Sequence, residues 1–321
     1  MELDYVPLGS TGTRVSELAF GTWRFGRETP KGSIEIGEER AYGLLNAYAD
    51  RGGRFIGTAD VYGDGKSERW IGNWLADRDR EDFVIASKVY WPTREGDPNG
   101  GGLGRKHLRR QIDRILERLD TDYVDLLYTH RWDDETPVEE FMRTLDGFVA
   151  DSRVHYLGTS TFEPNAWKVA RANEVARQHG YEPFTVAQPR YNLVDREIVG
   201  NYLEMSREYG IGVCPWSPLA GGFLTGKYDR ESGLPEGSRA ARSDDFGDRY
   251  FTEANFRVLD VLLEVANELD AAPAAVALAW LREQGTVPIV GARTPGQLET
   301  NLSATGVSLT ESQYERLSEA A

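Results

Sequence analysis

Three ionisable side chains in this sequence each come at the end of a short apolar segment, and their types suit acid–base chemistry. They are Tyr62, Lys88 and His130. An ammonium group beside a phenol favours the phenolate and so lowers the pKa of the tyrosine. Such a hydroxyl can donate or accept a proton near neutral pH, and a neutral imidazole can orient a substrate oxygen. The set predicts proton transfer to or from the oxygen of a carbonyl or alcohol carbon.

Each of these residues also has an ordinary structural interpretation. Tyr62 fits an aromatic residue in a turn, Lys88 a solvated loop residue, and His130 a hydrogen-bonded core histidine. The catalytic interpretation is favoured when the three residues are taken together, because successive strands would bring all of them to one place. The set contains no nucleophile next to a base, so acyl transfer is not favoured.

Short apolar segments alternate with amphipathic segments of helical period along the chain. The sequence predicts strands near 18–20, 54–58, 83–87, 123–128, 153–158, 184–187, 211–215 and 287–290, and helices near 35–51, 67–77, 104–119, 137–150, 163–179, 196–209, 251–268 and 273–283. This alternation indicates an α/β fold with a parallel sheet covered on both faces. Eight such units in 321 residues favour a (β/α)8 TIM barrel over a doubly wound sheet.

Other segments complete the predicted fold. Residues 3–18 indicate an N-terminal β-hairpin, and a helix near 310–320 lies outside the eightfold pattern. No linker or change in composition divides the chain, so we expect one domain over residues 1–321. Long loops at 91–104 and 218–250 follow strands, and this places them on the face where barrel enzymes keep their sites.

The overall charge limits the kinds of partner. The chain has 37 basic and 52 acidic residues, a net charge of −15, which argues against a nucleic-acid partner. The acid-rich, lysine-poor composition would suit a high-salt cytoplasm, although genomic base composition alone would also favour arginine. The sequence has no apolar run long enough for a membrane-spanning helix and no secretory signal, so we expect a cytoplasmic protein without a membrane partner.

Metal and disulfide chemistry are not indicated. The single cysteine, Cys214, follows Val213 in an apolar run and reads as a small core residue. The four histidines are scattered, and there is no cysteine pair, so the spacing predicts no metal site.

The usual nucleotide-binding motifs are also missing. No Gly-x-Gly-x-x-Gly follows a predicted strand, which argues against a Rossmann site. Residues 221–227 approximate a Walker A loop, but Tyr228 stands where magnesium binding needs Ser or Thr. Two later strand ends carry Gln188 and Trp216, and a side-chain amide and an indole suit a flat aromatic ring that bears a carboxamide. A strand-end hydrogen bond and core packing are the alternative roles.

The order and spacing of several motifs resemble the aldo-keto reductase family, in its short-loop branch related to potassium-channel β subunits. The motifs are Gly21-Thr22-Trp23, Thr58-Ala59-Asp60-Val61-Tyr62-Gly63, Ser87-Lys88, Leu127-Tyr128-Thr129-His130, Gly158-Thr159-Ser160, Gln188, Trp216-Ser217-Pro218-Leu219, and Gly291-Ala292-Arg293 through Asn301. The likeness covers nearly the whole chain. It implies a (β/α)8 barrel that binds NADP(H) across its C-terminal face and reduces an aldehyde or ketone to an alcohol.

The resemblance also implies roles for individual residues. Tyr62 would be the general acid, Lys88 would lower its pKa, and His130 would orient the carbonyl. The implied cofactor-binding residues are Gly21, Thr22, Trp23, Ser160, Gln188, Trp216, Ser217, Pro218, Leu219, Gly221, Lys227, Gly291, Arg293, Gln297 and Asn301.

Cofactor preference depends on the adenosine end of this set. In many relatives a lysine and an arginine grip the 2′-phosphate, and those positions are Gly291 and Gln297 here. Arg293 supplies a nearby cation, so we expect NADP rather than NAD.

One departure from the family pattern bears on catalysis. The family places an aspartate five residues before the catalytic tyrosine, and that position is Gly57. Asp60 comes three residues too late to replace it directly. Weakened reductase activity is therefore expected. The alternatives are an NADP(H)-binding sensor or regulatory subunit with little turnover, and redox-neutral proton transfer by Tyr62 and Lys88. The substrate and the oligomeric state are left open.

Overall fold

Eight parallel strands form the centre of the molecule. The computed structural model describes residues 2–29, 32–161, 165–230 and 244–320. The strands are β3 (Ala19–Gly21), β4 (Phe55–Gly57), β5 (Val84–Val89), β6 (Val124–Thr129), β7 (Val154–Ser160), β8 (Phe184–Gln188), β9 (Gly212–Val213) and β10 (Ile289–Val290). Their order is β10-β3-β4-β5-β6-β7-β8-β9. The Val287 N–H donates to the Val213 carbonyl at 2.9 Å, and the Ile289 N–H donates to the Pro215 carbonyl at 2.9 Å, which closes the sheet into a barrel.

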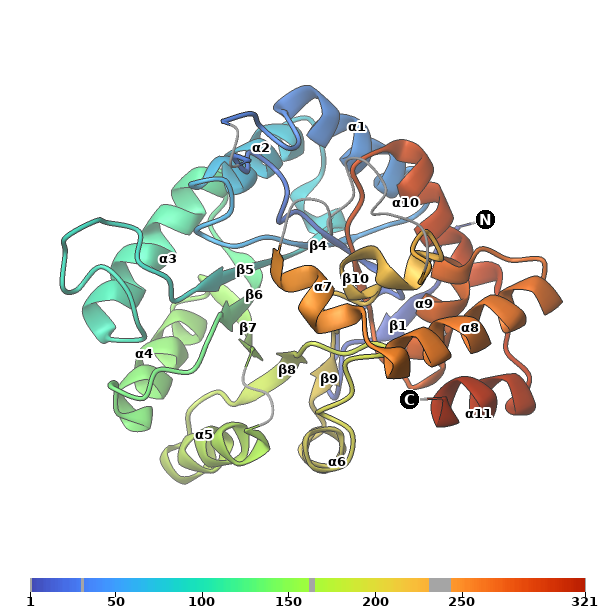
Figure 1. The fold of residues 1–321 in the computed structure, drawn as a ribbon. Helices are drawn as coiled ribbons and strands as arrows, with labels where there is room; N and C mark the ends of the chain where they lie inside the picture. The colour runs from blue at the N-terminus through green and yellow to red at the C-terminus, as the bar shows by residue number, and fades with distance from the viewer. Residues whose placement is uncertain (1, 30–31, 162–164, 231–243, 321) are drawn as a thin grey trace.

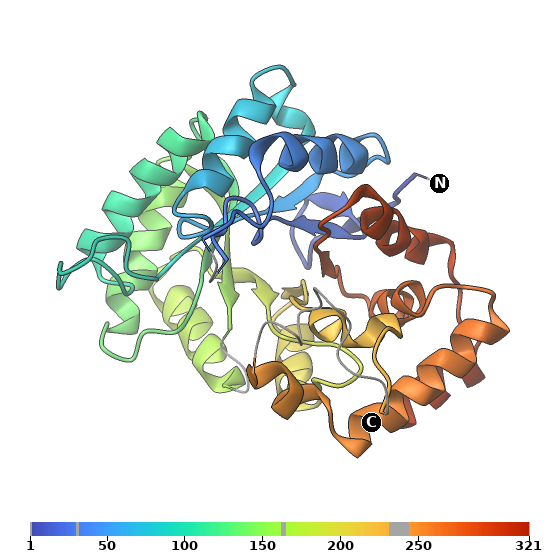
Figure 2. The same ribbon diagram turned by 45° about the horizontal axis from the view of Figure 1, so that its top comes forward.

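Helices surround this barrel on the outside (Figures 1 and 2). They are α1 (Glu38–Ala49), α2 (Lys66–Leu75), α3 (Arg105–Leu119), α4 (Val138–Ala150), α5 (Ala166–His179), α6 (Asn201–Glu208), α7 (Asp244–Tyr250), α8 (Glu253–Glu268), α9 (Pro273–Glu283), α10 (Pro295–Leu302) and α11 (Glu311–Glu319), with short 3-10 turns η1 (Arg80–Asp82), η2 (Ala220–Thr225) and η4 (Ser303–Gly306). The strands β1 (Tyr5–Pro7) and β2 (Arg14–Ser16) pair as an antiparallel hairpin. The predicted (β/α)8 TIM barrel, N-terminal hairpin and extra C-terminal helix are confirmed.

The structure corrects three details of the predicted elements. Helix α6 begins at Asn201 rather than near 196, because Gly200 has φ 89° and interrupts the helical backbone. Helix α10 was not predicted, although Thr294 accepts a hydrogen bond from the Gln297 N–H at its start. Helix α7 lies inside the predicted loop 218–250, of which residues 231–243 fall outside the described ranges.

Alternating side chains divide the core into two parts, one inside the barrel and one between strands and helices. Phe55 and Ala86 belong to the cluster inside the barrel. Their neighbours Ile56 and Ile85 belong to the larger cluster that includes the helices. This alternation is the period of two expected for strands. Within the described ranges, none of the helices combines the length and apolar character needed to cross a membrane.

The hydroxyl of Tyr48 joins helix α1 to two barrel strands. The side chain is fully buried. Its hydroxyl oxygen lies 2.7 Å from the Leu18 carbonyl oxygen and accepts a hydrogen bond from the Phe55 N–H at 3.3 Å. This single group therefore satisfies backbone atoms beside β3 and β4 that water cannot reach.

Replacing Tyr48 with Phe should lower the free energy of unfolding by about 1–3 kcal/mol, because buried backbone groups lose their partner. Urea denaturation followed by circular dichroism would measure the change. Tyr42→Phe is the matched control, since Tyr42 lies on the same helix and its hydroxyl bonds Glu38 at the surface. Equal losses in the two variants would contradict this account of Tyr48.

Candidate active site

The alternation of the barrel strands also aims the predicted site residues at one end of the barrel. Ala86 points inside the barrel, and Lys88 follows two residues later on the same strand. Five other lining residues also come two positions after a residue that points inside the barrel. These pairs are Tyr128 and His130, Val186 and Gln188, Cys214 and Trp216, Ala19 and Gly21, and Phe55 and Gly57. Polar and small residues thus replace apolar ones at the C-terminal ends of the strands. Residues far apart in sequence converge there, as in other barrels of this type.

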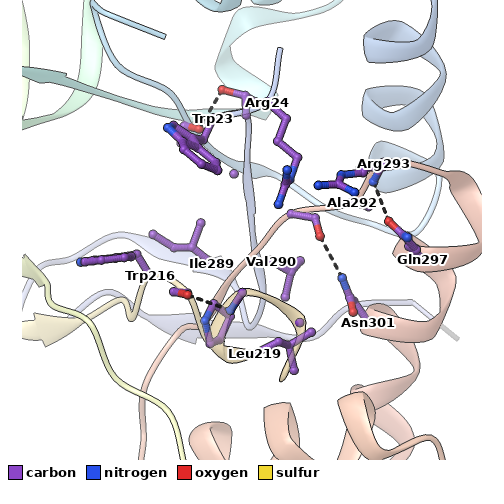
Figure 3. A pocket seen from close by; sticks show the side chains of 18 of the residues that line it. Trp23, Arg24, Trp216, Leu219, Ile289, Val290, Ala292, Arg293, Gln297 and Asn301 are labelled. Atoms are coloured by element: carbon purple, nitrogen blue, oxygen red, sulfur yellow. Dashed lines mark hydrogen bonds between the residues drawn. The ribbon is translucent and has the colours of Figure 1, made fainter. Parts of the chain in front are cut away.

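A cavity of about 910 Å³ opens at this end of the barrel. Every predicted catalytic and cofactor-binding residue lines it: Gly21, Thr22, Trp23, Gly57, Tyr62, Lys88, His130, Ser160, Gln188, Trp216, Ser217, Pro218, Leu219, Gly221, Lys227, Gly291, Arg293, Gln297 and Asn301. Figure 3 shows Trp23 and Arg24 on one side of the cavity, with Trp216 and Leu219 on the opposite side. The predicted site residues therefore line a single cavity.

Tyr62, Lys88 and His130 meet at the inner end of the cavity. The Lys88 ammonium donates to the Tyr62 hydroxyl oxygen at 3.2 Å and to the Thr58 carbonyl oxygen at 2.8 Å. The rings of Tyr62 and His130 lie edge to face, with centroids 5.9 Å apart. The His130 Nδ1 atom is buried and has no hydrogen-bond partner in the part of the chain that the structure describes.

Burial has the largest effect on the pKa values of Lys88 and His130. Burial lowers the pKa of Lys88 to about 7, against the opposing effect of the Asp60 and Glu68 carboxylates. Burial, and then the charge of Lys88, hold the pKa of His130 well below its usual value, which favours the neutral imidazole.

Burial outweighs the lowering of the Tyr62 pKa by Lys88 that the residue types predicted. Burial raises the pKa of Tyr62 above its ordinary value, and the charge of Asp60 raises it further. The lysine contacts the tyrosine oxygen, but burial lowers the pKa of Lys88 and so disfavours its charged form. The phenol is therefore a weaker acid in this structure than the pairing of residue types implied.

Gly57 leaves open space beside Lys88. A Cβ atom built on Gly57 would have only the Phe20 carbonyl oxygen within contact range, at 4.0 Å. Both Gly57 and Lys88 line the cavity, and the lysine side chain is otherwise buried. Among the described residues, Lys88 forms two hydrogen bonds and no ion pair. The backbone at Gly57 therefore leaves room for a Cβ atom without displacing neighbouring atoms.

The two carboxylates nearest to Lys88 lie in a buried polar cluster behind the cavity wall. Glu68 accepts hydrogen bonds from the Ser87 hydroxyl at 2.5 Å and from the Arg118 Nε at 2.6 Å. Asp60 is 2% exposed, and neither carboxylate oxygen has a hydrogen-bond partner within the described ranges. Burial, and then the charge of Glu68, raise the pKa of Asp60 well above its usual value. Neither carboxylate lines the cavity.

Polar side chains from neighbouring strand ends form another part of the cavity lining. The Gln188 Nε2 and Trp216 Nε1 atoms are buried and lack hydrogen-bond partners among the described residues. The Ser160 hydroxyl donates to the Gln188 carbonyl oxygen at 3.0 Å and lies at the same strand end.

The charges around the cavity are all of one sign. Its lining contains six basic residues and no acidic one; the basic residues are Arg24, Arg27, Lys88, Arg190, Lys227 and Arg293. The chain as a whole has 52 acidic residues against 37 basic ones. A basic lining in an acidic protein favours an anionic ligand.

The loop after β9 curls tightly at the edge of the cavity. Ser217, Gly221 and Gly222 have φ angles of 54°, 64° and 103°. The Gly221 N–H donates to the Ser217 hydroxyl at 3.1 Å. A Cβ on Gly222 would lie 3.0 Å from the Lys227 ammonium, so glycine lets this cation approach the backbone. The near match to a Walker A motif is thus a curled loop and a 3-10 turn rather than a strand–loop–helix unit.

An ion-pair cluster that the sequence did not predict lies at the outer end of the cavity. Glu35 pairs with Arg293 at 2.9 Å, with Arg27 at 3.7 Å and with Arg24. Arg24 points toward Arg293 in Figure 3. The only signal in the sequence was the closeness of Arg24 and Arg27 to the Gly21-Thr22-Trp23 motif.

Two other side chains at this end form hydrogen bonds within the protein. The Gln297 side-chain oxygen accepts a hydrogen bond from the Arg293 N–H at 2.9 Å, and the Asn301 side chain donates to the Gly291 carbonyl at 3.2 Å. The cavity lining also includes Trp91, Thr161 and Arg190, which the sequence analysis did not select. Arg190 lies over the Trp216 ring, 4.4 Å from its centroid.

Comparison with known proteins agrees with this architecture. The model of the Aldo/keto reductase family matches residues 17–321. Norsolorinic acid reductase stcV of Emericella nidulans is 36% identical over 94% of this chain and 77% of its own length. A probable voltage-gated potassium channel subunit beta of Oryza sativa subsp. japonica is 35% identical over 95% of this chain and 92% of its own. The uncharacterized oxidoreductase YrpG of Bacillus subtilis is 34% identical over 96% of this chain and 92% of its own length. The chain therefore belongs to the aldo/keto reductase family.

Proposed function

We propose that this protein is an NADP(H)-dependent oxidoreductase that reduces an aldehyde or ketone to an alcohol. The observation that carries the proposal is the Tyr62 hydroxyl, which is hydrogen-bonded by a buried lysine beside a neutral histidine in a basic cavity. Membership of the aldo/keto reductase family supports it, as do relatives named as reductases and oxidoreductases.

The residues of the inner site divide the chemistry between them. When bound, NADPH would supply a hydride to the carbonyl carbon. Tyr62 would give its hydroxyl proton to the carbonyl oxygen, so that the product is an alcohol and the tyrosine is left as a phenolate. The Lys88 ammonium, 3.2 Å from that oxygen, would stabilise the phenolate until a proton returns from solvent. The neutral His130 would hold the carbonyl oxygen in line with Tyr62.

The rest of the cavity would hold the cofactor. Trp216 would stack on the nicotinamide, and Ser160 and Gln188 would bind its carboxamide. The curled loop and Lys227 would meet the pyrophosphate, and the residues around Arg293 would meet the adenosine end. Because Arg293 already pairs with Glu35, a 2′-phosphate would enter a cluster of three arginines and one carboxylate.

A second function is supported by Gly57. Lys88 has no carboxylate partner within ion-pair distance among the described residues, and one relative is named as a channel subunit. These observations favour a cofactor-binding sensor or regulatory subunit with little turnover. Steady-state NADPH oxidation with a panel of aldehydes separates the two functions. Proton exchange or isomerisation without net cofactor consumption would indicate the redox-neutral chemistry instead.

NADPH should quench the intrinsic tryptophan fluorescence, because Trp23 and Trp216 line the cavity. Trp216→Leu should weaken both the quenching and the affinity. Trp167→Phe is the control, since Trp167 is 59% exposed on α5 and is not part of the cavity lining. A titration in which NADPH causes no quenching and binds in no calorimetric test would overturn the proposed cofactor.

Arg293→Gln should reduce the affinity for NADPH by about tenfold while changing that for NADH much less, since a lost charge-assisted bond costs roughly 1.5–3 kcal/mol. The two dissociation constants would be measured by fluorescence titration. Arg316→Gln is the control, because Arg316 pairs with Glu268 on the outer surface. Equal losses for both cofactors would show that Arg293 does not read the 2′-phosphate.

Reduction should slow as the pH rises through about 7, because Lys88 loses its proton in that range and no longer stabilises the phenolate. Gly57→Asp should raise kcat and move this descending limb to higher pH, since a carboxylate favours the charged lysine. We expect a gain of about fivefold at pH 8 for a rise of one pK unit, because the charged fraction of Lys88 would grow from roughly a tenth to about a half.

Gly57→Asn is the matched control for shape, because the amide fills the same space without charge. Tyr62→Phe should remove the activity altogether and so assign it to this site. A robust wild-type rate that Gly57→Asp leaves unchanged or lowers would refute the weakened-site account.

A further inference from the structure

The open space at Gly57 connects the buried ammonium of Lys88 to the cavity. Gly57 on β4 pairs with Ala86 on β5, and Lys88 lies two residues beyond Ala86 on the same side of the sheet. Both residues line the cavity. A group that enters the cavity and occupies the position of a Cβ and carboxyl on Gly57 would therefore lie next to Lys88.

The neighbours of Lys88 leave its positive charge poorly compensated. A hydroxyl and a backbone carbonyl oxygen are its two hydrogen-bond acceptors. The titratable groups that face it are Tyr62, His130, Tyr128, whose ring centroid is 6.0 Å away, and the more distant Asp60 and Glu68. Neutral partners cannot offset the loss of hydration of a buried ammonium, which needs an anion nearby.

The two carboxylates behind the wall do not fill this need. Glu68 is already bound by Ser87 and Arg118. Asp60 is buried outside the cavity and forms no ion pair with Lys88 within 4.0 Å. The lowered pKa of Lys88 agrees with this geometry, since its charged form lacks a close partner.

We propose that the space between Gly57 and Lys88 is a binding site for a small carboxylate, which acts as the counter-ion of Lys88 during reduction. The proposal rests on the proposed function for its effect on catalysis, although the binding itself does not depend on it. Acetate has the atoms of an aspartate side chain beyond the backbone, and only the Phe20 carbonyl lies within 4.0 Å of the first of them. The carboxylate can come from a free anion or from the substrate itself.

A bound carboxylate would act on the site through Lys88 alone. It would accept a hydrogen bond from the ammonium, favour its charged form and so strengthen the stabilisation of the Tyr62 phenolate. The chain would then depend on a ligand for a charge that Gly57 does not provide.

The catalytic test uses NADPH-dependent reduction of benzaldehyde at pH 8, with sodium acetate compared with sodium chloride at equal ionic strength. If the carboxylate is a free anion, acetate should raise kcat saturably, by about fivefold for a rise of one pK unit in Lys88. Gly57→Asn, whose amide fills the space, should not respond to acetate. If the carboxylate belongs to the substrate, phenylglyoxylate should be reduced by the wild-type protein with a kcat/KM about tenfold above that of benzaldehyde, and Gly57→Asp should reverse this preference.

A second measurement does not need turnover. The chain has only six lysines, so the Lys88 side-chain signal can be assigned by ¹⁵N NMR of lysine-labelled protein with the Lys88→Arg variant as reference. Acetate, and phenylglyoxylate in the other arm, should shift this signal and raise its titration midpoint in the wild type. Neither should do so in Gly57→Asn.

The outcomes separate the two proposals. If no variant oxidises NADPH with any carbonyl compound, the proposed function fails, while the NMR titration still decides the carboxylate site. If the protein is active but neither carboxylate changes the rate or the Lys88 signal, the carboxylate site is refuted. A response of equal size in wild type and Gly57→Asn would also refute it, because the anion would then bind elsewhere.

Discussion

Strand geometry sets the positions of Lys88, His130 and the other site residues at the strand ends. In a parallel barrel, each second residue points inward, and the last inward residue of each strand reaches the mouth. The inner cluster fills the barrel with apolar side chains up to Phe55, Ala86 and Tyr128. The next inward positions are Gly57, Lys88 and His130. A shift of one residue in any strand would turn these groups toward the surrounding helices and leave the mouth without them.

The same geometry explains the electrostatics of the site. Lys88 is held at the rim of an apolar barrel, so burial weakens its charge and makes the tyrosine beside it a poorer acid. Farther out, the cavity is lined by cations from loops rather than strands, and these face solvent more freely. The inner end is therefore a region of low dielectric, while the outer end carries the cations that face solvent.

Much of the site could be predicted from sequence because it lies at strand ends. Apolar segments mark the strands, and the residue at the end of each segment must reach the mouth, as Lys88 and His130 do. Tyr62 lies in the loop that follows β4, five residues after Gly57. The helix α10 was missed because its eight residues bury only Leu298, Asn301 and Leu302, too few for a clear helical period. The raised pKa of Tyr62 was missed because burial depends on contacts across the fold, which residue types alone do not give.

The cluster around Glu35 has a consequence for the energetics of binding. Arginine side chains lose up to about 2 kcal/mol of conformational entropy when they are fixed. Here Arg24, Arg27 and Arg293 are already gathered around one carboxylate that is held between segments of the chain. The Glu35 N–H donates to the Arg27 carbonyl at 2.8 Å, so the backbone itself fixes the position of that carboxylate. The ordering of these arginines is thus completed when the chain folds, and an arriving phosphate would find its partners already in place.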